Sequence, residues 1–546
     1  MNRFLPSRRR AATLLALGSL LPVSLASFAQ TASSHALADG ASSPLRGGVL
    51  RAVVQPEPVT LNPGYNNSYV NGVVATNVLE GLLSYDRNHQ AKPGLATRWQ
   101  VSPDALTLRF DLRQGVTWHD GKPFTSADVR YSALEVWKKV HPIGRNIFAD
   151  LEDVQTPDDH TAVFRFKRPS LVVLNFLNAQ GSPVLPRHLY EGTDVLNNPL
   201  NLKPVGTGSF RFKEWRPGQS IELVRNDSYW DAGKPYLDGI VFRIIPDAAA
   251  RVAALEAGEV DYVPWDSVPL ADLERLRASP ALRVEYQGYT WQSNYLVLEF
   301  NLRHEALSKP EVRHAIAHAI DRPGLTKTVW YGLGTPSTSA IPSTLKPFYT
   351  TQDVPQYPFD PALANRLLDQ AGYPRKADGV RFAIHIDYAP FNQNFGRHAE
   401  YIKQNLKRVG IQVEVRNQDL ASYLKRVYTD YDFDIHTTRW APYIDPQLGG
   451  LRQFWSQAIS KGTPWQNASG YANPEIDAVI EKIRYAPAQA QRQAAFKDFQ
   501  RIAQRDLPAM ALYEEKNFTV RNQRVRGLSD DADASQAALK NVWLGK

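Results

Sequence analysis

The chain has 546 residues, with 63 lysine and arginine residues against 55 aspartate and glutamate residues, a formal net charge of +8 and no cysteine. Half of that positive excess comes from Arg3, Arg8, Arg9 and Arg10, so the rest of the chain lacks the basic surface that a nucleic-acid-binding protein presents. Without cysteine there is no disulfide framework and no attachment point for an N-terminal lipid, so a hydrophobic core has to stabilise the fold.

The N-terminus has the pattern of a secretory signal. A basic start precedes an apolar run over residues 11–29, and small residues follow it. We therefore predict a cleaved signal peptide and leader over residues 1–38. The arginine pair Arg8-Arg9 leaves both general secretory export and twin-arginine export open. No later run is apolar enough to cross a membrane, so we expect a periplasmic protein without a lipid anchor.

The first part of the mature chain opens with a short strand and a helix. Leu50 to Val54 is a short apolar run, and Leu61-Asn-Pro63 opens a loop that leads into a helix expected around residues 73–82. The following stretch, residues 96–129, predicts a strand, a tight turn and a capped helix. Apolar and polar residues alternate over residues 106–112, and Thr125 with Asp128 has the spacing of a helix N-terminal capping box.

The remaining elements alternate between strands and helices. Strands are expected at residues 240–245 and 260–263, with a short helix at 249–257 between them. The second half has an α/β texture, with a strand at 295–300, helices at 310–321 and 401–409, and a strand at 411–415. Asn473-Pro474 begins another helix, and we find no internal repeat.

Catalytic and metal-binding motifs are missing from this pattern. There is no nucleophile elbow and no phosphate-binding loop, and Gly206-Thr-Gly208 lacks the next glycine of a dinucleotide fingerprint. His314 and His318 have the spacing of two metal ligands on one helical turn, but they lie off the apolar face and no carboxylate set accompanies them. We interpret them as a solvated face and expect no cofactor, no metal and no enzyme activity.

The stretch of residues 96–129 closely resembles the signature of solute-binding family 5, the extracellular receptors for dipeptides, oligopeptides and nickel that serve ABC importers. Pro204 to Phe210, Asn226 to Trp230 and Lys234 to Asp238 follow in the family's order, and the resemblance covers residues 47–546. It implies an α/β fold of the two-lobed periplasmic-binding-protein type, with mixed sheets, an extra subdomain in the first lobe and a two-stranded hinge.

The resemblance also implies where the domains divide. The first lobe would comprise residues 47–90, the extra subdomain 91–202, a second part 203–297 and a final return 511–546. The second lobe would comprise residues 298–510. The chain would cross between the lobes near Asn294–Phe300 and near Ala509–Tyr513, where strand-like stretches lie.

The segment that runs from Arg439-Trp440 through Pro442-Tyr443 to Asp445-Pro446 is the first candidate for solute binding. In peptide-binding relatives the comparable loop provides an aromatic wall and an acid that pairs with the ligand's α-amino group. This chain has Pro442 at the position of that acid, whereas Asp445 corresponds to the next acidic position. The core reading, in which the aromatics pack inside and Asp445-Pro446 is a plain turn, remains open.

The other candidate ligand contacts are placed by their position relative to the family pattern, and a structural role is open for each. Asn67 and Tyr69 follow the first loop, Asn294 and Tyr295 lie at the first crossing, and Tyr513 lies near the second. Arg426 has the chemistry to hold a carboxylate bidentately, and Arg439 has the same chemistry.

The resemblance implies a monomeric receptor that captures a small-molecule or peptide ligand by hinge closure and passes it to an inner-membrane ABC permease with its ATPase subunits. A peptide-like solute is the first expectation, and a nickel chelate or an opine-type solute is an alternative within the same family. A secreted hydrolase of peptides or glycans and a scaffold or adhesion protein are the alternatives from other classes. No nucleic acid is expected as a partner.

Overall fold

The computed structural model describes residues 43–546, so the predicted signal peptide and leader at residues 1–38 lie outside the described part. Within that part no helix is both long and apolar enough to cross a membrane. Two large sheets organise the described chain. The strands of the first come from both ends of the sequence, and the strands of the second come from the stretch between them.

The first large sheet has seven strands in the order β12-β19-β11-β1-β10-β9-β8. Their bounds are β1 Val49–Val54, β8 Phe210–Arg216, β9 Ser220–Arg225, β10 Gly239–Ile244, β11 Tyr262–Val263, β12 Leu282–Glu285 and β19 Thr519–Asn522. β1 pairs in parallel with β10 and with β11, whereas β19 is antiparallel to its neighbours. Its helices are α1 Tyr69–Ala75, α5 Ala248–Glu256 and α6 Leu273–Ala278. The apolar side chains of β1 and β10 share a core with those of α1.

Helix α1 differs from its prediction. It begins at Tyr69 and ends at Ala75, whereas the apolar pattern placed it around residues 73–82. The side chain of Asn77 explains the early end, because its Nδ2 donates to the carbonyls of Val73 at 2.9 Å and Val74 at 3.3 Å. A side chain that bonds to backbone carbonyls competes with continuation of the helix.

A smaller antiparallel sheet carries the stretch of residues 96–129. Its strands are β4 Ala96–Val101, β5 Thr107–Leu112, β7 Thr161–Phe166 and β6 Leu151–Asp158, in that order. The predicted capping box is confirmed: Thr125 and Asp128 bond reciprocally at the start of α2 Ser126–Tyr131. Val129, Ala133 and Trp137, which follow the cap, are all buried. The signature residues therefore build a local core.

The second large sheet has six strands in the order β14-β18-β13-β17-β15-β16. Their bounds are β13 Tyr295–Phe300, β14 Gly334–Pro336, β15 Phe382–Tyr388, β16 Ile411–Arg416, β17 Ile435–Trp440 and β18 Ala509–Glu515. One core joins the sheet to the helices α8 Pro310–Ala319, α9 Arg322–Val329, α10 Pro361–Gln370 and α11 Gln393–Arg408. A second core contains the apolar faces of α13 Pro474–Tyr485 and α14 Gln489–Asp506. The remaining short elements are α3 Gly144–Ile147, α4 Arg187–Tyr190, α7 Glu305–Ser308, α12 Leu420–Leu424, β2 Leu83–Tyr85, β3 Ala91–Pro93, β20 Val525–Arg526 and β21 Trp543–Leu544.

The interpretation of the two histidines on α8 as a solvated face is wrong. His318 is buried, and its Nδ1 lies 2.7 Å from the carbonyl oxygen of Pro358. His314 Nε2 lies 2.8 Å from the carbonyl oxygen of Arg505. Both rings contact Tyr357. The loop between β14 and α10, which contains Tyr357 and Pro358, covers this face of the helix, and the local pattern does not reveal that.

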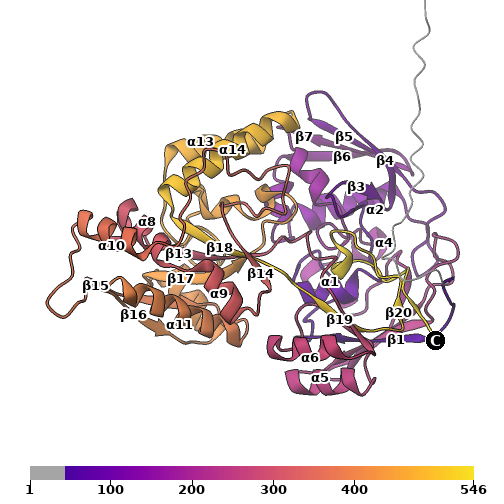
Figure 1. The fold of residues 1–546 in the computed structure, drawn as a ribbon. Coiled ribbons are helices and arrows are strands. Elements are labelled where there is room, and N and C mark those ends of the chain that lie inside the picture. Colours follow the sequence, from indigo (N-terminus) through magenta and orange to yellow (C-terminus); the bar gives the residue numbers. More distant parts are fainter. Residues whose placement is uncertain (1–42) are drawn as a thin grey trace, which may run out of the picture. The chain divides into compact units, whose positions relative to one another are not determined.

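The two sheets are joined by short segments. The chain leaves the first sheet after β12 and enters the second at β13, and Figure 1 shows it returning from β18 into β19. The stretches predicted as crossings thus lie inside the second sheet, where β13 and β18 pair antiparallel. The connecting segments are residues 286–294 and 516–518. The domain limits stay a prediction.

Gly206 marks a close approach of two backbones. A Cβ atom at this position would lie 1.7 Å from the carbonyl oxygen of Val78. We expect Gly206→Ala to lower the free energy of unfolding by about 2 kcal/mol, because backbone on both sides has to move. Urea unfolding of the variant measures this. Gly545→Ala is the matched control, since its Cβ would meet no atom closer than 3.6 Å, and an equal loss in both variants would contradict the prediction.

Candidate functional site

The loop after β17 begins inside the second sheet. Trp440 is the last residue of β17 and lies directly opposite Tyr295 on β13. Both side chains are 1 % exposed and share a small apolar cluster with Val297 and Ala511. The ring of Trp440 is therefore part of the packing, although its indole Nε1 has no hydrogen-bond partner among the described residues.

Tyr443, in the loop after β17, contacts residues from the first half of the chain and from the connecting segment 286–294. Its backbone has a positive φ of 61°, and its N–H donates to the carbonyl of Gln292 at 3.0 Å. Its ring lies 4.9 Å from that of Trp291 and 6.5 Å from that of Phe176, between ring centroids. Burial raises the pKa of Tyr443, and hydrogen bonding to Asn67 opposes that rise. Tyr443 and Asn67, predicted independently as ligand contacts, are thus brought together.

Asp445 has a different setting from the one predicted. Its carboxylate is fully buried, and Oδ2 lies 2.7 Å from Nη2 of Arg492 on α14. The same oxygen accepts from Asn175 Nδ2 at 3.0 Å, and Oδ1 accepts from the backbone N–H of Gln447 at 3.0 Å. Because the carboxylate is fully buried and already paired with a guanidinium, it presents no exposed oxygen to a ligand ammonium. The geometry gives Asp445 a structural role.

Arg439 faces the opposite side of β17 from Trp440. Its Nε lies 2.6 Å from Oε2 of Glu515 at the end of β18. This ion pair lines a cavity of about 360 Å³ whose walls come from β17 and β18 of the second sheet, from α5, from the loop at residues 266–271 and from the connecting segment 516–518. Asp266 lines it too, and burial raises the pKa of that carboxyl to about 7. Trp330, Arg397 and Arg251 are among the other side chains around it.

Tyr69 and Asn294 lie near the connecting segments. The ring of Tyr69 stacks on Trp265 with 3.9 Å between the centroids, and its hydroxyl donates to the carbonyl of Ser535 at 3.4 Å. Asn294 is buried; its Nδ2 donates to Gln292 Oε1 at 3.3 Å, whereas Oδ1 lacks a partner among the described residues. Tyr69 is half-buried.

Two of the predicted contacts are held away from this region. Arg426 lies 3.9 Å from both Asp387 and Asp432, carboxylates of its own half of the chain. Tyr513 is fully buried, with its ring 5.3 Å from that of Trp330 in the core beneath α9 and α11. On β18 the side chain of Tyr513 points into this core, and position in the sequence does not show that.

Arg452 is a residue that sequence reasoning missed. It belongs to the single 3-10 turn Leu451–Gln453, and its guanidinium carbon lies 5.2 Å from the centre of the Trp440 ring. Burial lowers the pKa of Arg452, and the hydroxyls of Tyr443, Tyr428 and Tyr295 oppose that shift. No motif surrounds Arg452 in the sequence. Only the fold distinguishes Arg452, because it shows that no carboxylate of the described residues lies beside its guanidinium.

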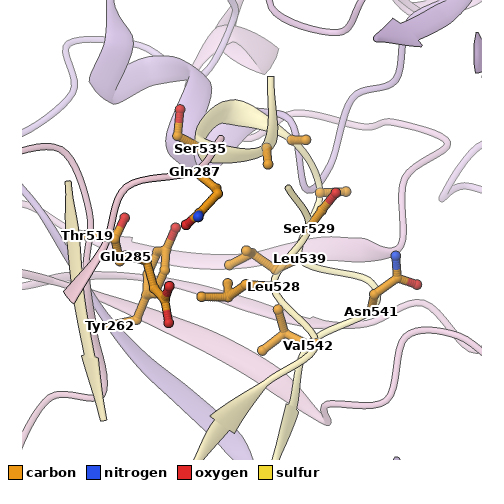
Figure 2. Close-up of a pocket in the computed structure, with 14 residues that line it drawn as sticks. Tyr262, Glu285, Gln287, Thr519, Leu528, Ser529, Ser535, Leu539, Asn541 and Val542 are labelled. Carbon is orange, nitrogen blue, oxygen red and sulfur yellow. The ribbon is translucent and has the colours of Figure 1, made fainter. Parts of the chain in front are cut away.

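A second cavity lies against the first sheet. Figure 2 shows Leu528, Leu539 and Val542 of the C-terminal segment facing Tyr262 and Glu285. Its volume is about 30 Å³. That volume is the share of a single water molecule in the liquid, so this cavity is too small for a transported solute.

Residues 90–462 match the family described as bacterial extracellular solute-binding proteins, family 5 Middle. The oligopeptide-binding protein AppA of Bacillus subtilis is 26% identical over 558 residues, which covers 99% of this chain and 99% of that protein.

Two solved structures extend the likeness to the fold. A periplasmic binding protein DppA from Helicobacter pylori, in complex with the peptide STSA, has a TM-score of 0.77 and 25% identity, covering 92% of this chain and 99% of that one. The binding protein AgaA from A. tumefaciens R10, in complex with agropinic acid, has a TM-score of 0.73 and 26% identity, covering 91% and 99%. The predicted two-lobed α/β fold and the predicted family are confirmed.

Proposed function

Because this chain belongs to family 5 of the bacterial extracellular solute-binding proteins, we propose that it is the periplasmic receptor for a peptide-like solute. The receptor acts as a monomer and delivers the solute to an inner-membrane ABC permease with its ATPase subunits. Export depends on the signal over residues 1–38, by either secretory route.

The contacts of Tyr443 are the observation that supports our placement of the solute. Tyr443, from the loop after β17, lies on Trp291 and meets Asn67 at the point where the chain passes between the sheets. Four further candidates lie close to the same connecting segments in the chain or in the sheets: Asn294, Tyr295, Arg439 and Trp440. Tyr69 on α1 stacks on Trp265, whose ring lies 5.7 Å from that of Tyr289 in the connecting segment. We assign these residues to the walls of the solute site, whereas Asp445, Arg426 and Tyr513 serve the packing. The domain limits proposed with it are 47–90, 91–202, 203–297, 298–510 and 511–546.

Binding works by hinge closure. A solute that contacts both lobes has greater affinity for the closed form and shifts the equilibrium by that difference. A shift from mostly open to mostly closed requires on the order of 5 kcal/mol of differential affinity. Two or three hydrogen bonds to charged groups contribute on that scale.

A specific observation supports an opine-type solute as a second candidate. Pro442 replaces the acid that would hold a peptide ammonium group, and Asp445 is already paired with Arg492. The similar protein AgaA was solved with agropinic acid, whereas the similar DppA was solved with a peptide. Both solute types carry a carboxylate, and only the free peptide requires a partner for its amino terminus.

Calorimetric titration with the peptide STSA and with agropinic acid, combined with native mass spectrometry, tests the proposal. We expect one solute to bind stoichiometrically and to be recovered with unchanged mass, together with a smaller radius of gyration in X-ray scattering. A solute released in chemically altered form would instead support the hydrolase alternative. Absence of binding to any peptide or opine would contradict the proposed function.

Tyr69→Ala is expected to lower the affinity for the solute that binds in these titrations about tenfold, because a half-buried ring in contact with the solute contributes on the order of 1 kcal/mol. Tyr69→Phe keeps the ring and serves as the matched control, with an affinity within about twofold of the wild type. The dissociation constants come from the same titrations. Equal affinity of Tyr69→Ala and the wild type would remove Tyr69 from the site.

A further inference from the structure

The guanidinium of Arg452 is a cation without a counter-ion in the described chain. It makes no hydrogen bond and no ion pair with any residue between 43 and 546; its one contact of this kind is the face of Trp440. Other arginines of the same region are paired. Arg439 has Glu515 at 2.6 Å and Arg492 has Asp445 at 2.7 Å. Arg452 is therefore the exception among them.

Aromatic rings and hydroxyls surround this cation in place of carboxylates. The titratable side chains that act on Arg452 are the phenols of Tyr443, Tyr428 and Tyr295, whose hydroxyls stay protonated and uncharged because burial raises their pKa. The side chain of Arg452 is only partly buried, so the guanidinium stays open to water. No residue in the described range supplies an anion for it, and an anionic ligand can pair with it in place of that water.

Three hydrogen-bond donors belong to Arg452, to its chain neighbour Gln453 and to Trp440, whose ring Arg452 contacts. Arg452 Nε, Trp440 Nε1 and Gln453 Nε2 are all buried and lack an acceptor among residues 43–546. The other end of the Gln453 amide is fixed, because its Oε1 accepts from the hydroxyl of Tyr295 at 3.4 Å. Unpartnered buried donors are uncommon in folded proteins and need an explanation. One acceptor-rich group would satisfy all three.

These donors lie at the proposed solute site. Trp440 and Tyr443 belong to the loop after β17, and Tyr443 also meets Asn67 from the first half of the chain. The acids that might have favoured a cationic solute are missing from this loop or already engaged, as Pro442 and the paired Asp445 show. The local chemistry thus selects for negative charge.

We propose that Arg452, Trp440 and Gln453 form an anion subsite that receives a carboxylate of the transported solute. The substrate class follows: acidic solutes, peptides or opines, held through a carboxylate rather than through an ammonium group. A guanidinium binds a carboxylate with two parallel hydrogen bonds, which fixes the orientation of the solute as well as its charge. This inference rests on the proposed receptor function.

The test uses the mature protein and a casein hydrolysate supplemented with agropinic acid. One portion of the mixture is left untreated, and in the other all carboxylates are converted to methylamides. Native mass spectrometry measures the fraction of protein that retains a solute and the mass of that solute. The variants are Arg452→Gln, Arg452→Lys and, as a control, Arg366→Gln, whose side chain is exposed on α10.

We expect the wild type and Arg366→Gln to retain a solute from the untreated mixture only. Arg452→Gln should weaken the binding of this solute at least thirtyfold. The affinity of Arg452→Lys should lie between those of Arg452→Gln and the wild type, because lysine keeps the charge but loses the paired geometry. The unfolding temperature of ligand-free Arg452→Gln should stay the same or rise, since an uncompensated charge is removed; a purely structural arginine would lower it.

Two results would overturn the subsite and leave the receptor function standing. One is equal retention of solutes from the methylamide mixture, and the other is wild-type affinity in Arg452→Gln. Retention of no solute from either mixture by the wild type would contradict the receptor function itself, and the subsite with it.

Discussion

We expect Arg492→Leu to lower the free energy of unfolding by about 3–5 kcal/mol, because it leaves the carboxylate of Asp445 buried without its counter-ion. Both side chains are almost completely buried, and their atoms are 2.7 Å apart. Asn175 and the N–H of Gln447 remain as partners of the carboxylate, but neither carries a charge. Urea unfolding followed by tryptophan fluorescence measures the loss.

A double-mutant cycle separates the ion pair from simple packing. Asp445→Asn combined with Arg492→Leu should be more stable than Arg492→Leu alone, because the uncompensated charge is gone. Arg187→Leu is the control, since its pair with Glu191 at 3.0 Å is exposed and is expected to contribute less than about 1 kcal/mol. A loss below 1 kcal/mol in Arg492→Leu would show that Asp445 is free to serve a ligand, as the sequence first suggested.

We expect the protein to lose stability between pH 4 and pH 7 through Asp533, and Asp533→Asn to remove that part of the loss. Burial, reinforced by the charge of Asp531, raises the pKa of Asp533 from 3.8 to about 7. The folded protein therefore keeps a proton that the unfolded chain releases as the pH rises. Between these pH values unfolding releases a proton, so the destabilising effect of Asp533 is absent below pH 4 and complete above pH 7.

The size of this effect at pH 8 is about 4 kcal/mol, because the pKa changes by roughly three units and one unit corresponds to about 1.36 kcal/mol. Asp533→Asn should be more stable than the wild type at pH 8 and similar to it at pH 4. Unfolding free energies at four pH values measure the difference. Asp227→Asn, at an exposed position, should follow the wild-type curve. Parallel curves for Asp533→Asn and the wild type would refute the assignment.

Local structure could be predicted from the sequence, whereas the partners of charged groups could not. The capping box of Thr125 and Asp128 and the strand that became β5 are set by residues a few positions apart, so periodicity and spacing reveal them. Asp445 finds Arg492 on α14 and Asn175 from the first half of the chain. Such pairings depend on how distant elements pack.

The same limit applies to the candidate site. The loop of Trp440 and Tyr443 was identified by its likeness to a family, and the fold brings Tyr443 to Asn67. No sequence pattern points to Arg452, because what distinguishes it is the lack, in the described part of the chain, of a carboxylate beside its guanidinium. Whether a charge has a counter-ion depends on which residues the fold brings next to it, and the sequence alone does not show that.

The place of β19 in the first sheet has a consequence for how the newly made chain behaves. β12 pairs with β19 and with no other strand in the described sheets, so its edge lies open until residues 519–522 arrive. A nascent chain that has left the ribosome only as far as its middle therefore cannot complete its first sheet. Nearly the whole polypeptide has to be synthesised before the two ends of the sequence can meet and seal that edge.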